Sequence, residues 1–268
     1  HQPRLTDIKQ VSAGSQFSGA LTNSGDLYFW GFNTYGQYGT GNVTASRSPI
    51  LSPVTGLKEF SCGGQHVLGL KNNGTVWAWG YNGQGQLGTG SITPAYSYNE
   101  VQVPGLSSIV HVSAGYAHSL AVRSDGTVWG WGSNVYGQVG DGATGGTRYS
   151  PVQVVLQGAA NVINVSAGGS YYGNYNGHSL ALRSDKTVWA WGYNGYGQLG
   201  NGGTTATATP VQVMQDATTP LTNVIAIAAG SDHSLALKED GTVWAWGYGG
   251  QGQIGDGGTG NKSFATQV

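Results

Sequence analysis

SDGTVWGWGSNVYGQVG, at residues 124–140, occurs in nearly the same form five times along the 268-residue chain. Five Trp-Gly pairs mark these copies, at 30–31, 79–80, 131–132, 191–192 and 246–247. A catalytic motif normally occurs once, whereas a unit repeated about every 50 residues is typical of solenoids and propellers. The repeat therefore indicates an architecture rather than a chemistry.

Each copy has the same internal order of short alternating segments. In the third copy these are IVHVSAG at 109–115, HSLAVR at 118–123 and TVWGWG at 127–132. Period-two alternation bounded by Gly, Asn and Asp predicts strands. Such a unit cannot bury its own faces, but units packed around an axis can. We predict an all-β fold, a β-propeller of five blades with four antiparallel strands each, as a single domain over 1–268.

The hairpin turns between the second and third segments carry Gly in four copies and Lys186 in the fourth. Gly accepts a positive φ in such turns without steric cost. We expect Lys186 to adopt the same left-handed conformation, which costs a residue with a Cβ on the order of 1 kcal/mol.

The two ends of the sequence look complementary. The fifth unit is entered through TPVQV and a following strand-like segment, within 209–230, whereas the chain begins at HQPRLTDIKQVSAG without the TPVQV part. The last residues, SFATQV at 263–268, resemble the missing part. We therefore expect pairing of the N- and C-terminal segments to close the ring, because closure leaves no sheet edge open.

Composition narrows the function classes. The net charge is −1, from 11 basic and 12 acidic residues, which disfavours direct nucleic-acid binding. No apolar run approaches the roughly 20 residues that a membrane helix needs, so membrane insertion is not expected. A single Cys excludes an intrachain disulfide. A surface with few charges and many Thr, Asn, Ser and Tyr suggests a bacterial, secreted or cell-surface protein.

The combination AGxxHSLALxxDGTVWAWGxNxxGQLGxG resembles the repeat of the regulator-of-chromosome-condensation family. The matching residues are Gly115, 118–122, 125–131 and 137–140, with their counterparts in the other copies. The resemblance implies a β-propeller with four-stranded blades, although better-known members have seven. Members include an exchange factor for a small GTPase, a photoreceptor, an enzyme inhibitor and parts of ubiquitin ligases, so the fold does not decide the function.

The most irregular part of the repeat is a candidate binding loop. In the other copies two residues separate the Gly that ends the first segment from the His or Phe that begins the second. In the fourth copy this stretch is GSYYGNYNG, at 169–177. Tyr and Asn are effective recognition residues, although a tolerated insertion is the alternative. We predict a partner-binding face formed by Tyr171, Tyr172, Asn174 and Tyr175, with Gln16, Gln65, Tyr116 and Asp232 from the equivalent loops. Tyr96 and Tyr98, in a long connection, form a second candidate edge.

Two recurrent residue types are interpreted as structural. The histidines at one repeat position are His66, His118, His178 and His233, with Phe17 in the first copy. Equivalent positions in separate blades lie too far apart to share a metal ion, so we expect each His to bond backbone inside its blade. Residues i and i+2 face the same side of a strand, so the Trp pairs should pack between blades. These pairs are Trp77/Trp79, Trp129/Trp131, Trp189/Trp191 and Trp244/Trp246.

No motif for catalysis or phosphate binding is present, and no carboxylate pair stands out, so we expect no catalytic residues, metal or cofactor. The sequence predicts a non-enzymatic binding propeller with a protein partner. A glycan-binding, lectin-like propeller is the alternative, and an exchange factor for a small GTPase is the third possibility.

Overall fold

The computed structural model describes residues 4–171 and 175–268, and it confirms an all-β fold of five four-stranded antiparallel sheets. Blade 1 consists of β1 (Ile8–Ala13), β2 (Phe17–Thr22), β3 (Leu27–Gly31) and β4 (Ser46–Leu51). Blade 2 consists of β5 (Leu57–Cys62), β6 (His66–Lys71), β7 (Val76–Tyr81) and β8 (Tyr96–Gln102). Blade 3 consists of β9 (Ile109–Ala114), β10 (His118–Arg123), β11 (Val128–Ser133) and β12 (Thr147–Gln153).

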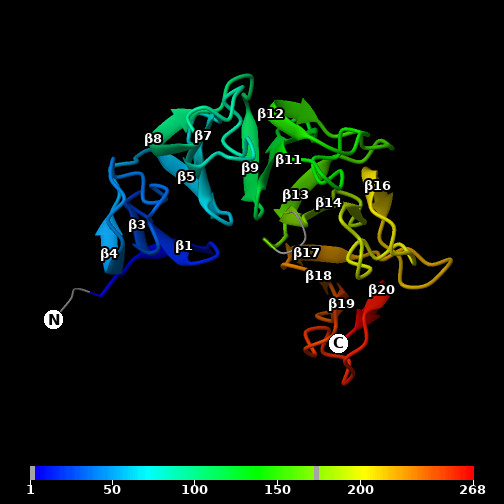
Figure 1. Cartoon of the computed structure of the whole chain (residues 1–268). Helices are drawn as coiled ribbons and strands as arrows, with labels where there is room; N and C mark the ends of the chain where they lie inside the picture. The colour runs from blue at the N-terminus through cyan, green and yellow to red at the C-terminus, as the bar shows by residue number, and fades with distance from the viewer. Residues whose placement is uncertain (1–3, 172–174) are drawn as a thin grey trace.

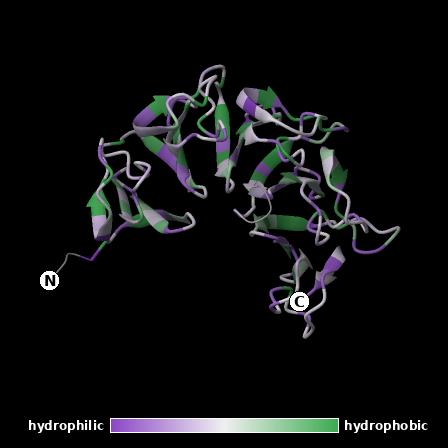
Figure 2. Ribbon diagram, in the orientation of Figure 1, coloured by the Kyte–Doolittle hydropathy of each residue, from purple (hydrophilic) through white to green (hydrophobic). Residues whose placement is uncertain are grey.

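Blade 4 consists of β13 (Val162–Ala167), β14 (His178–Arg183), β15 (Val188–Gly192) and β16 (Thr207–Gln212). Blade 5 consists of β17 (Val224–Ala229), β18 (His233–Lys238), β19 (Val243–Gly247) and β20 (Lys262–Gln267). The first strands of successive blades contact one another, and the blades follow one another along an arc (Figure 1). Hydrophobic residues concentrate in the strands (Figure 2).

The expected closure by the two terminal segments is wrong. The C-terminal strand β20 pairs with β19 and completes blade 5, while blade 1 is complete with β1–β4. Figure 1 shows an arc that is open between blades 1 and 5. The physical reason is that each TPVQV-type segment hydrogen-bonds the Trp-Gly strand that precedes it, as β16 bonds β15. Every repeat therefore supplies all four strands of its own blade, and none remains to pair across the opening.

A buried hydrogen-bond network joins adjacent blades. At the junction of blades 2 and 3, His66 Nε2 lies 2.9 Å from Ser119 Oγ, and that hydroxyl donates to the Gln86 carbonyl at 2.9 Å. The indole Nε1 of Trp131 donates to the same carbonyl at 2.8 Å. Because the Ser hydroxyl uses its proton on the carbonyl, it accepts from the imidazole, so Nε2 carries the proton. We call this arrangement the junction relay.

The relay recurs at the next two junctions. His118, Ser179, Trp191 and the Gln138 carbonyl form it between blades 3 and 4. His178, Ser234, Trp246 and the Gln198 carbonyl form it between blades 4 and 5. The histidines therefore bond a hydroxyl of the next blade, and not backbone inside their own blade, because the fold brings the two strands together only across a junction.

The first junction replaces the polar pair with an apolar one. Phe17 stands at the His position of blade 1, Val67 stands at the Ser position of blade 2, and both belong to one buried hydrophobic cluster. Trp79 still donates to the Gln37 carbonyl, at 2.9 Å. The two substitutions compensate for each other, since either one alone would leave a buried polar group without its partner.

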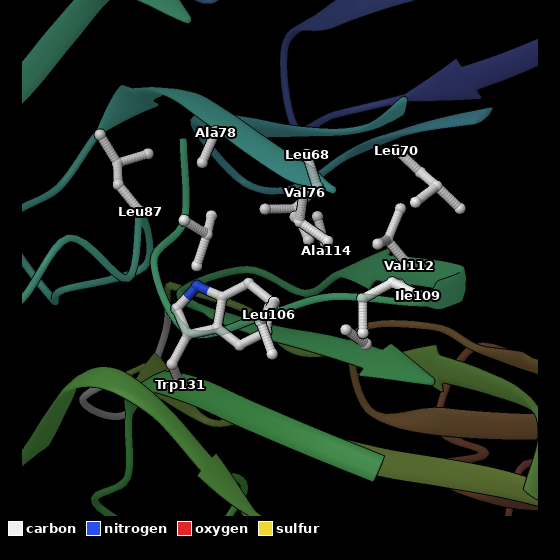
Figure 3. Packing of buried hydrophobic residues seen from close by; sticks show 12 residues of the cluster. Leu68, Leu70, Val76, Ala78, Leu87, Leu106, Ile109, Val112, Ala114 and Trp131 are labelled. Atoms are coloured by element: carbon white, nitrogen blue, oxygen red, sulfur yellow. The ribbon is translucent and has the colours of Figure 1, made fainter. Parts of the chain in front are cut away.

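The hydrophobic core lies between blades rather than within them. The cluster between blades 2 and 3 contains Leu68 and Ala78 from one side and Val112 and Trp131 from the other. Figure 3 shows Trp131 beside Leu106, with Leu68 and Ala78 across the junction. The second Trp of each pair is fully buried in blades 2 to 5, and Trp129 packs against this same cluster while remaining partly exposed.

A Lys or Arg side chain lies over the ring of the first Trp of each pair. Lys71 lies 3.9 Å from the ring centroid of Trp77, and Arg183 lies 4.1 Å from that of Trp189. A cation over an indole face is attracted by the ring quadrupole. These contacts join the second and third strands of one blade, since Lys71 and Trp77 belong to β6 and β7, whereas the buried second Trp of each pair lies at the junction.

Acid should unfold the protein through the relay histidines. Burial lowers the pKa of His66, His118 and His178 to about 3, against 6.5 in an unfolded chain. Their contribution is fully present above pH 6.5 and is lost as the pH falls from 6.5 towards 3, because only the unfolded chain takes up the protons. Below pH 6.5, each His should lower the free energy of unfolding by about 1.4 kcal/mol for every unit of pH. Urea unfolding between pH 8 and pH 4 measures this slope.

The double variant His178→Phe/Ser234→Val is the matched control, because it copies the natural junction between blades 1 and 2. It should fold and show a shallower pH dependence, with one His fewer. Unfolding free energies that stay constant from pH 7 to pH 5 would contradict this account.

Replacing Lys186 by Gly should stabilise the protein. Lys186 has φ +63°, as expected from the sequence, and the glycines at the same turn in other blades have φ between +77° and +95°. The Lys186 ammonium pairs with Glu239, but both side chains are well exposed and such pairs contribute little. We expect Lys186→Gly to raise the free energy of unfolding by about 0.5–1 kcal/mol, measured by thermal melting. Lys186→Ala, which keeps the Cβ, should give no gain, and equal melting temperatures for the two variants would refute the explanation.

Candidate functional site

Two sets of loops lie on one face of the arc. The residue after each Trp-Gly pair donates its backbone N–H to the loop that follows the first strand of the blade: Tyr81 to the Gln65 carbonyl at 2.9 Å, and Tyr248 to the Asp232 carbonyl at 2.8 Å. The loops that follow the first and third strands therefore meet at the same end of each sheet. We call this surface the tyrosine face, after Tyr35, Tyr81, Tyr116, Tyr136, Tyr171, Tyr175, Tyr193, Tyr196 and Tyr248.

A cavity of about 670 Å³ opens on this face, and loops of all five blades line it. We call it the bowl. Its lining includes Gln16, Gln65, Tyr116, Tyr171 and Asp232. The structure thus brings together five of the residues that the sequence suggested for partner binding. Below the bowl, a smaller cavity of about 210 Å³ is lined mainly by the Ala-Gly segments that end the innermost strands.

Three tyrosines cluster at one side of the bowl. The ring centroids of Tyr116 and Tyr171 are 6.2 Å apart, and those of Tyr171 and Tyr175 are 5.8 Å apart. Gln138 Nε2 donates to the Tyr175 carbonyl at 3.1 Å, which fixes this loop against blade 3. Tyr171 is 63% exposed, so most of its side chain faces solvent. Tyr172 and Asn174, which were predicted to contribute, lie outside the described residues.

The sequence reasoning missed the tyrosines of the Trp-Gly loops. They occupy the first and fourth positions after the Trp-Gly pair, and a fourth-position Tyr of one blade contacts a first-position Tyr of the next. Ring centroids are 4.9 Å apart for Tyr35 and Tyr81, and also for Tyr196 and Tyr248. The signal was present as the recurrent spacing in WGYNGYGQ at 191–198. Because these tyrosines belong to the repeat itself, the sequence alone does not distinguish them from its structural residues.

Asp232 differs from the other carboxylates on the tyrosine face. Asp141 pairs with Arg148, and Asp256 pairs with Lys262 at 2.7 Å. Within the described ranges, Asp232 forms no ion pair with Lys or Arg, and its Oδ1 is buried without a hydrogen-bond partner. Burial raises the pKa of Asp232, and the neighbouring His233 offsets this only in part. The same burial lowers the pKa of His233, so this imidazole is neutral at pH 7.

Three tyrosines of the face have a raised pKa. Burial raises the pKa of Tyr81, and the nearby Tyr175 adds to the shift. Burial also raises the pKa of Tyr116 and of Tyr193, and the negative charge of Asp232 raises that of Tyr193 further. In the part of the face that the structure describes, aromatic rings and hydroxyls thus surround Asp232, which has no Lys or Arg partner. Among the described residues, no group of three or more His, Cys, Asp or Glu could hold a metal ion.

The second candidate edge lies away from the bowl. Tyr96 and Tyr98 belong to β8, the last strand of blade 2, and their rings stack with centroids 5.0 Å apart. The Gly41 N–H of blade 1 donates to the Tyr98 carbonyl at 3.0 Å, and a Cβ on Gly36 would lie 2.5 Å from the Tyr98 ring. Tyr98 therefore packs against the preceding blade, while Tyr96 is partly exposed at the rim.

A family model described as RCC1-like domain matches residues 1–268. The chain belongs to this family. Over 257 residues it is 30% identical to the ultraviolet-B receptor UVR8 of Arabidopsis thaliana, covering 96% of this chain and 45% of the receptor. Over 144 residues it is 39% identical to the human probable E3 ubiquitin-protein ligase HERC6, covering 53% of this chain and 13% of the ligase. This RCC1-like chain thus spans less than half the length of these relatives.

Solved structures agree on the fold of this RCC1-like chain. Prp20p of Saccharomyces cerevisiae superposes with a TM-score of 0.83 at 22% sequence identity, covering 97% of this chain and 63% of that one. Human WBSCR16 superposes with a TM-score of 0.82 at 25% identity, covering 97% and 67%. At this level of identity the similarity to Prp20p shows the fold alone. The described residues include no helix of the length and hydropathy needed to span a membrane.

Asp232→Asn should stabilise the protein at neutral pH. Burial raises the pKa of Asp232 in the folded protein above its unfolded value of 3.8. The charged carboxylate therefore destabilises the folded state at pH values above the raised pKa, and this penalty is absent below pH 3.8. The side chain is half-buried, so solvent screening keeps the effect small. We expect a modest rise in melting temperature at pH 7 that disappears near pH 3. A lower melting temperature for the variant at pH 7 would show that the carboxylate makes a stabilising contact.

Proposed function

We propose that this RCC1-like chain is a non-enzymatic binding module that recognises a protein partner through the bowl and the surrounding tyrosine face. The supporting observation is the convergence of loops from all five blades on one cavity of about 670 Å³ with an aromatic rim. Tyr is enriched among interface residues that contribute most to binding, because it supplies a large, rigid contact area together with a hydroxyl.

Proteins of the same fold support the choice of a protein partner. The structure of Prp20p was described together with its binding to Gsp1p and histones, and yeast RCC1 has been solved bound to Kap60. Those partners belong to those proteins. What carries over to this chain is the class of ligand, since loops on a rigid scaffold are suited to diverse partners. From composition, we further propose that the partner is met outside the cell or at its surface.

A capture experiment tests this function. The immobilised chain would be exposed to an extract and surface fraction of its native source, beside Tyr171→Ala and a control, Tyr149→Ala. Tyr149 is 44% exposed and lies on β12, away from the bowl. We expect a specific protein whose retention falls at least about tenfold with Tyr171→Ala and is unchanged with Tyr149→Ala. Equal retention by both variants would remove the bowl from the proposal.

A glycan partner is favoured by one observation, the well-exposed Tyr171 ring among Gln and Ser side chains with few charges. A glycan array of the intact chain, beside a version with 169–177 replaced by Ser-Asp, discriminates this alternative: binding that is lost on trimming makes the chain a lectin. A nucleotide-release assay on a small GTPase addresses the exchange-factor alternative, which an unchanged release rate at micromolar protein would discard.

A further inference from the structure

The described lining of the bowl contains a negative charge and no positive one. Asp232 is the only charged residue among the described residues that line it, and neither Lys, Arg nor His contributes to the lining. Its buried Oδ1 has no hydrogen-bond partner. A buried carboxylate oxygen without a partner is costly, so a site that keeps one is suited to a ligand that donates to it.

The aromatic surroundings favour the same kind of donor. Tyr116 and Tyr171 line the bowl with Asp232, and Tyr175 packs on both of these tyrosines. Ring faces attract cations, and a planar guanidinium stacks on them while it donates hydrogen bonds to a carboxylate. Phe32 of blade 1 adds a further ring to the lining.

The other acidic side chains of the face offer no equivalent site. Asp141 accepts from Arg148 and Asn134, and Asp256 pairs with Lys262, so each already has its cation. His233, next to Asp232 in sequence, is neutral at pH 7 and supplies no counter-charge. Among these three acidic side chains, only Asp232 therefore keeps a carboxylate oxygen without a partner, and it lies in the bowl.

We propose that the group entering the bowl is an arginine side chain of the protein partner, with its guanidinium against the Tyr116–Tyr171 side and donating to Asp232. This inference rests on the proposed function and names the chemistry that the bowl selects. A neutral sugar would leave the carboxylate without a counter-charge, whereas an acidic peptide would be repelled.

Small probes test the inference without knowledge of the partner. Nα-acetyl-arginine methylamide and its neutral isostere, Nα-acetyl-citrulline methylamide, would be titrated into the intact chain and followed by tyrosine ring and backbone amide NMR shifts. We expect millimolar binding of the arginine probe, at least about fivefold tighter than the citrulline probe. Asp232→Asn should abolish the difference, and Asp141→Asn, which alters a carboxylate already paired with Arg148, should leave it intact.

Three results would overturn the inference: equal affinity for the two probes, a preference for arginine that survives Asp232→Asn, or shifts confined to residues outside the bowl. Its failure is distinguishable from failure of the proposed function. If the captured protein is lost with Tyr171→Ala but retained with Asp232→Asn, the bowl binds a partner without a cationic anchor. If Tyr171→Ala retains the captured protein, the bowl is not the binding surface.

Discussion

The rest of the structure depends on one backbone carbonyl at each blade junction. The carbonyl of Gln86 accepts from both Trp131 and Ser119 of the next blade, and that Ser accepts from His66, which belongs to the same blade as Gln86. All of these donors are buried, so a blade that moved away would leave several polar groups unsatisfied together. At three junctions the relay therefore holds adjacent blades together, while the apolar clusters at the junctions supply most of the favourable free energy.

The tyrosine face follows from this constraint. Because the relay ties the start of the second strand of one blade to the start of the second strand of the next, the loops beside these residues come to lie next to each other. A fourth-position Tyr then reaches a first-position Tyr of the following blade, as Tyr136 reaches Tyr193 at 4.9 Å. The repeat thus builds an aromatic surface from residues that lie one repeat apart in the sequence. Variation at single loop positions, such as Asp232, gives that surface its chemistry without disturbing the scaffold.

The open arc shows where the relay ends. His233 of blade 5 occupies the relay position, yet no hydrogen bond to its ring occurs in the part of the chain that the structure describes. On blade 1, Val11 is 72% exposed, whereas its counterpart Val112 at the next but one blade is 1% exposed. The relay histidine therefore recurs in blades 2 to 5, but its ring is hydrogen-bonded only where a following blade is present.

The sequence by itself determined the class of fold, the number of four-stranded blades and the left-handed turn at Lys186. These follow from local rules, since alternation, turn chemistry and repeat period act over a few residues and recur five times. It also indicated the loops that line the bowl, because Tyr171 lies in the insertion that interrupts the repeat and Asp232 lies in the equivalent loop of blade 5. Tertiary structure alone decided the partner of each His, the compensation between Phe17 and Val67, and the open arc. Those features depend on which strand of one blade faces which strand of the next. The periodicity within a repeat does not encode this contact between blades.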